Sequence, residues 1–176
     1  MSYDRFLAAI KDPDLIAVAA HWNTARGDRA MPAWSDIDAV ALRRALPFIW
    51  AWRYDGARKT FIGRLAGEEV VAVVGGNVRN RAIEDCFSPA ALPVIRGRLE
   101  AVLAGPSFMH GTGTVYVRHG YTGSGERIIL PLASDGIHAD GVIGATLYRF
   151  AVKPTAKDQI KFDPMEETIA FFPLGG

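Results

Sequence analysis

The sequence predicts an α+β domain in which short helices cover one face of a five-stranded antiparallel sheet, with a helical extension at the N-terminus. Three observations support this class. Apolar residues recur at helical spacing near the N-terminus, strand-like segments separated by Gly-rich turns fill the second half of the chain, and one longer amphipathic helix pattern precedes them. Helices and strands are therefore grouped along the chain instead of alternating, which favours an antiparallel sheet.

The N-terminal segment is predicted to be helical over residues 3–27. Asp12 and Pro13 provide a cap and a first-turn proline, and apolar residues follow at helical spacing. A second short helix is expected to end near Pro47, because the residue before a proline avoids the helical conformation. We assign residues 1–34 to an N-terminal helical extension.

A strand hairpin is predicted to follow. From Phe48 onward aromatic residues alternate with smaller or charged ones, and Asp55 and Gly56 turn the chain into a second strand that ends near Ala66. Short, irregular helices are expected after this hairpin. Three further strands complete the predicted sheet, at residues 108–118, 126–134 and 141–151.

Residues 88–105 carry the clearest amphipathic helix pattern in the chain. Its apolar residues recur at three- and four-residue spacing, opposite Arg96, Arg98 and Glu100, and Gly105 ends the helix. The pattern predicts a helix with an apolar stripe on one side and these charged residues on the opposite side.

The predicted strands and helices form one domain over residues 35–152. A tail follows at 153–176, which mixes charged residues with an apolar end and has no clean period. We expect this tail to dock on its own domain or on a partner protein.

Composition disfavours several classes of function. Lys and Arg number 20 and Asp and Glu number 19, so the formal net charge is +1 and no field that attracts nucleic acid is expected. The sequence has no apolar run of about 18 residues and no secretory signal pattern. Cys86 is the single cysteine and cannot form an internal disulfide. A cytoplasmic protein with no membrane partner is expected.

Short motifs recur in a definite order along the chain: His21-Trp22, Arg26 to Pro32 (RGDRAMP), Asp36-Ile37-Asp38, Leu46-Pro47, Arg64 to Gly67 (RLAG) and Gly75 to Arg81. Together with the order of the predicted elements, they resemble the PAS domain, and in particular a subfamily of short stand-alone bacterial proteins found mostly in alphaproteobacteria. The resemblance covers about residues 12–151. It implies a PAS-like fold and a role in signalling, and it supplies no established ligand or active site.

Two cofactor chemistries of PAS domains are disfavoured by the residues present. Flavin photosensors of this family form a covalent adduct with a cysteine in an Asn-Cys-Arg motif, whereas this chain has Val78 between Asn77 and Arg79. Haem-binding PAS domains take an axial histidine from the long helix, and residues 88–105 contain none. The cofactor remains unknown.

The sequence also gives little support for catalysis. Ser124 lies in a Gly-Ser-Gly turn without the strand-turn-helix context of an activated serine, and the histidines lack the spacing of a metal site. We therefore predict a non-catalytic protein. The alternative is a small cone-type α+β enzyme that acts on a small hydrophobic or anionic substrate and needs an inward pair of His and Asp or Glu. A first strand flanked by the second and the last strands would favour the PAS arrangement.

A candidate ligand pocket is predicted on the strands, with the residues Trp50, Trp52, Arg64, His110, Tyr116, Arg118 and Tyr148. Trp50 and Trp52 share one face of the first strand by the two-residue period. Such aromatics are more often ordinary core, where each contributes about 1.5–3 kcal/mol by burial whether or not a ligand is present. An inward Arg64 or Arg118 would indicate an anionic ligand, because a buried guanidinium needs a carboxylate or phosphate, while outward arginines would form a solvated face.

These patterns together predict a sensory or regulatory module that binds a small ligand or docks on a signalling protein, such as a histidine kinase or a cyclic-dinucleotide enzyme. The helix that carries Trp22 and the apolar end of the tail offer surface for a homodimer or for a partner helix, and the alternative is that each of them covers the sheet of its own domain.

Overall fold

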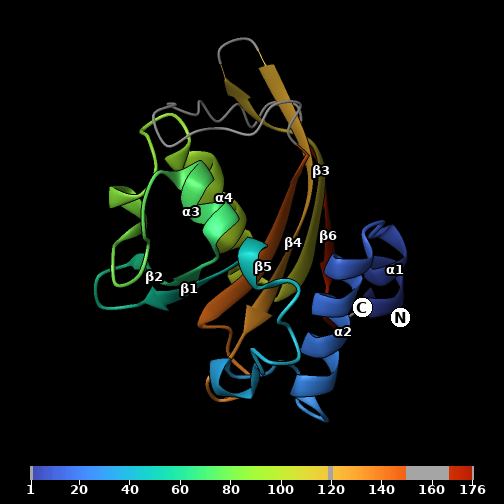
Figure 1. Ribbon diagram of the computed structural model, residues 1–176. Coiled ribbons are helices and arrows are strands. Elements are labelled where there is room, and N and C mark those ends of the chain that lie inside the picture. The colour runs from blue at the N-terminus through green and yellow to red at the C-terminus, as the bar shows by residue number, and fades with distance from the viewer. Residues whose placement is uncertain (1, 119–120, 150–166, 176) are drawn as a thin grey trace.

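The computed structural model describes residues 2–118, 121–149 and 167–175 of the chain. Helices cover both faces of one antiparallel sheet (Figure 1). The helices are α1 (Ser2–Ala9), α2 (Pro13–Arg26), α3 (Glu68–Val74) and α4 (Leu92–Ala104), with 3₁₀ turns at Trp34–Asp36, Leu46–Phe48 and Ile83–Asp85. The strands are β1 (Ile49–Asp55), β2 (Thr60–Ala66), β3 (Ser107–Arg118), β4 (Tyr121–Leu132), β5 (Gly141–Arg149) and β6 (Glu167–Pro173).

The strand order is β2-β1-β5-β4-β3-β6, and every neighbouring pair is antiparallel. The first strand lies between the second and the fifth, which is the arrangement that the sequence analysis named as PAS-like. The predicted fold class is confirmed, with one addition: the sheet has six strands and not five. The sixth comes from the tail, where β6 pairs with β3 from Ser107↔Pro173 to Gly113↔Glu167.

The N-terminal helical segment is interrupted at residues 10–12. Asp12 caps α2 by accepting the amide of Asp14 at 2.8 Å, and the predicted proline follows at the first helical position. The side chain of Glu126 on β4 accepts the amides of Lys11 at 2.8 Å and Asp12 at 3.0 Å. This carboxylate fastens the turn between α1 and α2 to the sheet.

The short helix that was expected before Pro47 does not form. Residues 39–45 are turns, and only the 3₁₀ turn at Leu46–Phe48 follows them. Val40, within these turns, is 72% exposed. The boundary at residue 34 between extension and domain stays a prediction.

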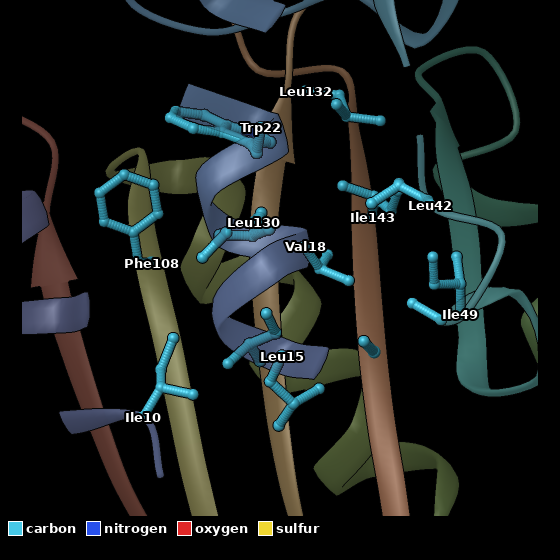
Figure 2. Packing of buried hydrophobic residues seen from close by; sticks show 14 of the residues in the cluster. Ile10, Leu15, Val18, Trp22, Leu42, Ile49, Phe108, Leu130, Leu132 and Ile143 are labelled. Carbon is cyan, nitrogen blue, oxygen red and sulfur yellow. The ribbon is translucent and has the colours of Figure 1, made fainter. Parts of the chain in front are cut away.

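One hydrophobic core lies between the sheet and the two N-terminal helices. Figure 2 shows α2 lying over the strands, with labelled side chains of the helix and of β3, β4 and β5 packed between them. The Trp22 indole N–H donates to the carbonyl of Pro131 at 2.7 Å, so the largest buried side chain of this face has its polar atom satisfied. Phe6 stacks on Phe108 with ring centroids 4.7 Å apart.

A second hydrophobic core lies on the other face, under α3, α4 and the segment between them. Alternation along β4 separates the two cores, since Ile128 and Leu130 belong to the first and Ile129 to the second. Gly63 on β2 allows the chain around Val78 to approach closely, because a Cβ at Gly63 would lie 2.1 Å from the Val78 carbonyl oxygen. None of the helices in the described ranges combines the length and the apolar character needed to cross a bilayer.

Candidate ligand cavity

A cavity opens inside the second core, between the sheet and the helices α3 and α4. The cavity has a volume of about 40 Å³, which is enough for a few water molecules. Apolar side chains form most of its wall: Trp50, Trp52, Ala66, Val70, Val74, Val78, Phe87, Ile95, Leu99 and Ile129. The polar groups of the wall come from Arg98, Arg127, Thr146 and Tyr148.

Three residues of the predicted pocket meet in this cavity, namely Trp50, Trp52 and Tyr148. The indole N–H of Trp50 donates to Thr146 Oγ1 at 2.9 Å, which fixes the plane of the ring. Gly144 makes room for that ring, because a Cβ there would lie 2.2 Å from Trp50 Cζ2. Trp50 is 9% and Trp52 3% exposed, so both indoles are buried core residues and also line the cavity.

The other residues of the predicted pocket lie elsewhere. Arg64 places its guanidinium carbon 5.4 Å from the ring centre of Trp34 and lines a separate cleft near Asp140. The sequence analysis considered a carboxylate, a phosphate or solvent as partners of Arg64. It did not consider the face of an aromatic ring, which also attracts a cation. Tyr116 and Arg118 belong to β3, but their side chains lie outside the described part of the structure.

His110 belongs to the opposite face of the sheet. Its Nε2 lies 2.8 Å from Glu126 Oε1, and both side chains are buried. This is the kind of histidine and carboxylate pair that the enzyme alternative requires. However, neither residue lines the cavity, and both oxygens of Glu126 accept the amides of Lys11 and Asp12. The pair therefore has a structural task in holding the α1–α2 turn.

A second pair, His138 with Asp135, lies in an exposed turn. His138 Nδ1 is 2.7 Å from Asp135 Oδ2, and the two side chains are 84% and 52% exposed. The hydrogen bonds from His138 and from the amides of Ile137 and His138 hold the pKa of Asp135 well below its usual range. In the parts of the chain that the structure describes, no three His, Cys, Asp or Glu side chains cluster closely enough to hold a metal ion.

The polar end of the cavity contains an ion cluster that the sequence analysis missed. Arg98 Nη1 donates to Glu167 Oε2 at 2.5 Å, and Arg127 Nε lies 3.3 Å from Glu167 Oε1. The side chains of Arg98, Arg127 and Glu167 are 8%, 6% and 0% exposed. Three segments that are far apart in sequence, α4, β4 and β6, thus bring charged groups together inside the protein.

Burial is the main electrostatic influence on Arg98. It lowers the pKa of the guanidinium, the positive charge of Arg127 lowers it further, and the carboxylate of Glu167 acts in the opposite direction. The prediction that Arg98 lies opposite the apolar stripe was wrong, because its side chain is buried. A signal for its position was present, since Ile95 and Val102 stand three residues before it and four residues after it, on the apolar stripe of the helix.

Burial also raises the pKa of Tyr148, whereas Arg127 and a hydrogen bond with Thr146 act in the opposite direction. The phenol therefore stays protonated at neutral pH and can donate or accept a hydrogen bond. Chemically, the cavity is an apolar chamber with guanidinium and hydroxyl groups at one end.

Comparison with known proteins gives one family. A family model described as PAS domain matches residues 10–147, and no curated protein matches the chain. Similar solved structures are VqmA bound to DPO (14% identity, TM-score 0.47, covering 66% of this chain and 57% of that one) and the Vibrio cholerae VqmA dimer without target DNA (14%, 0.46, 61% and 50%). A third is the Vibrio cholera VqmA–ligand–DNA complex (14%, 0.43, 62% and 49%). The chain spans about half the length of these proteins, and so distant a similarity says nothing about what it binds.

Proposed function

Because the chain belongs to the PAS domain family, we propose that it is a sensory or regulatory module that binds a small ligand in the cavity and does not catalyse a reaction. The cavity carries this proposal. Protein interiors are normally packed without voids, and an apolar cavity with a few convergent polar groups is the usual form of a ligand site. Burying charged groups also costs stability. The buried charges of Arg98, Arg127 and Glu167 at this cavity therefore favour a functional role.

The size of the cavity limits the ligand. Ligand pockets usually measure about 300–1,000 Å³, far more than the space of about 40 Å³ seen here. The ligand is therefore compact, or the wall moves outward to admit it. We propose α3 as the moving wall, because it has only seven residues, ends at Gly75 in the left-handed conformation and contributes Val70 and Val74 to the lining.

Movement of this wall would change the outer surface of the domain and so report that the ligand is bound. We propose that the change alters association with a signalling protein in the cytoplasm, such as a histidine kinase or a cyclic-dinucleotide enzyme, or with a second copy of this chain. The family membership supports a signalling role in general and leaves the partner open.

The test is to purify the protein, record its visible absorption spectrum and identify co-purifying small molecules by denaturing mass spectrometry. Val74→Trp should fill the cavity and abolish ligand retention. The matched control is Val71→Trp, on the same helix at a half-buried position that does not line the cavity, and it should retain the ligand. Retention by Val74→Trp, or the failure of the wild-type protein to retain or bind any small molecule, would refute the proposal.

A further inference from the structure

We infer that a surface cleft beside the first hydrophobic core binds a small phosphate monoester, and that Arg53 and Arg64 hold its phosphate group. The cleft has a volume of about 210 Å³ and lies between the 3₁₀ turn at Trp34–Asp36, the strands β1 and β2, and the segment that leads from β4 to β5. It is distinct from the cavity under α3 and α4, so the inference does not depend on the proposed function.

A β-bulge in β2 directs Arg64 to this cleft. Ala51 of β1 lies opposite Leu65 of β2, whereas the next residue of β1 lies opposite Gly63. Arg64 is therefore an extra residue in the pairing, next to a leucine that packs against the first core. Bulges of this kind re-aim side chains and are common next to functional sites. Here the bulge adds a guanidinium to the face of the sheet that carries the cleft.

Trp34 positions the guanidinium of Arg64. The guanidinium carbon lies 5.4 Å from the centre of the indole ring, and both residues are half-buried and line the cleft. The contact with the ring uses the positive charge of the guanidinium and leaves its N–H donors for an acceptor. An anion that enters the cleft would meet a fork of donors that is already held in place.

Arg53 brings a second guanidinium to the cleft. Alternation along β1 places it on the opposite face from Trp52, which packs in the second core. This is the face on which Trp34 and Leu132 pack in the first core, and both of these residues line the cleft. Among the described residues, no carboxylate forms an ion pair with Arg53 or Arg64. Both guanidinium groups are therefore available to a ligand.

The charge of the cleft favours an anion. Its charged residues are Arg53, Arg64 and Asp140, so positive charge exceeds negative charge by one. Oδ1 of Asp140 accepts the amide of Ser134 at 3.2 Å, which ties this carboxylate to the rim of the cleft. A carboxylate repels an anionic group and accepts hydrogen bonds from hydroxyl groups. We therefore place the phosphate of the ligand at the arginines and its hydroxyl groups at Asp140.

A phosphate monoester matches these donors better than a carboxylate does. It has three terminal oxygens and about 1.5–2 negative charges at pH 7, and two guanidinium groups together offer more donors than the two oxygens of a carboxylate can accept. The volume of about 210 Å³ lies below the usual range of about 300–1,000 Å³ for ligand pockets. The ligand is therefore compact, of the size of a phosphorylated polyol or pentose.

Calorimetric titration of the full chain with matched probes tests the inference. The probes are glycerol phosphate and ribose phosphate, their neutral counterparts glycerol and ribose, and the carboxylate glycerate. We expect at least one phosphate ester to bind about tenfold or more tightly than its neutral counterpart and than glycerate, because hydrogen bonds between charged groups are the stronger ones. Raising the salt concentration should weaken this binding, since salt screens exposed charges.

Arg64→Gln should lower the affinity for that ester by about tenfold or more, because the fork over Trp34 is lost. Arg53→Gln should lower it in the same direction and by less, since this side chain is exposed. The matched control is Arg58→Gln, which removes the same charge from an exposed position in the turn of the same hairpin, outside the cleft. This variant should bind the ester as the wild-type protein does.

Three results would overturn the inference: neither phosphate ester binds, glycerate binds as tightly as glycerol phosphate, or Arg58→Gln weakens binding as much as Arg64→Gln. None of these results bears on the proposed function, because that function is tested by ligand retention in the cavity. Circular dichroism checks that each variant is folded. Should Arg64→Gln not fold, Arg53→Gln and the ratio of affinities in the wild-type protein decide.

Discussion

The two faces of the sheet are built from the same strands but differ in how they are packed and in how their buried polar groups are satisfied. On the face under α1 and α2, the buried polar groups are satisfied by partners within that face, as in the bond from Trp22 to the Pro131 carbonyl and the amides bound by Glu126. On the face under α3 and α4 there is a cavity, and the buried charges of Arg98 and Glu167 meet at its end. One face resembles an ordinary protein interior, and the other resembles a binding site.

Adjacent residues of β4 point alternately to the two faces of the sheet. Glu126 and Ile128 serve the first face, while Arg127 and Ile129 line the cavity on the second. A short helix such as α3 has few buried contacts to hold it, and regions of this kind open more easily than a core. The comparison suggests a division of roles between the two faces of one sheet. The first face stabilises the fold and supports the second face, and the second face responds to a ligand.

The largest expected effect comes from breaking the buried ion cluster. Arg98→Met should lower the free energy of unfolding by about 3–5 kcal/mol, because it leaves the carboxylate of Glu167 buried without its hydrogen-bonded partner. The double variant Arg98→Met/Glu167→Met removes both charges of this pair and should recover part of this loss, because Arg127 then loses its nearby carboxylate. Chemical denaturation followed by circular dichroism measures all three proteins.

The control for this prediction is Arg96→Met, on the same helix. Arg96 pairs with Glu84 and Glu100 at the surface and has a side chain that is 29% exposed, so its replacement should cost about 1 kcal/mol or less. If Arg98→Met costs no more than Arg96→Met, the charges of the second face are not energetically buried and the contrast between the faces is lost.

Neighbouring isoleucines on β4 give the next largest effect and compare the packing of the two faces directly. Ile128 is 0% and Ile129 2% exposed, and truncation of a buried Ile to Ala costs about 2–5 kcal/mol. We expect the loss of unfolding free energy for Ile128→Ala to lie near the upper end of this range, because a rigid interior retains the new void. The loss for Ile129→Ala should lie near the lower end of the range, since the cavity wall can relax into the space. Equal losses in urea denaturation would show that the two faces are packed alike.

Local patterns predicted the parts of the fold that depend on near neighbours. The two-residue period of β1 placed Trp50 and Trp52 on one face, and the turn at Asp55 and Gly56 predicted the hairpin of β1 and β2. The tail strand was missed, because Ile169 and Phe172 are only half-buried and β6 becomes a strand by pairing with the distant β3. Its strand character therefore arises from a tertiary contact.

The ion cluster was missed for a similar reason. The charge of Arg98 suggested a position opposite the apolar stripe, although its neighbours on the helix are apolar, and its partner Glu167 is 69 residues away. Arg64 shows the opposite case, since it was considered for the pocket and instead lies over Trp34. Sequence patterns report the polarity of a side chain, whereas the burial of a charge depends on partners that only the fold brings together.

The smallest expected effect concerns Glu84, at the outer end of the second face, and separates surface charge from buried charge by pH. The hydroxyl oxygen of Thr60 lies 2.7 and 2.6 Å from the two oxygens of Glu84, which share its one hydrogen. This hydrogen bond, with help from Arg96, holds the pKa of Glu84 below its ordinary value. A lowered pKa contributes stability above the pKa of the unfolded state, and that stability is lost as the pH falls through the folded-state pKa.

Glu84→Gln should therefore lower the free energy of unfolding by at most about 1 kcal/mol at pH 7, since the group is partly exposed. The difference from wild type should shrink as the pH falls below about 4.5. Denaturation of both proteins across this range checks it. A difference that does not change with pH would mean that the loss comes from packing and not from the charge of Glu84.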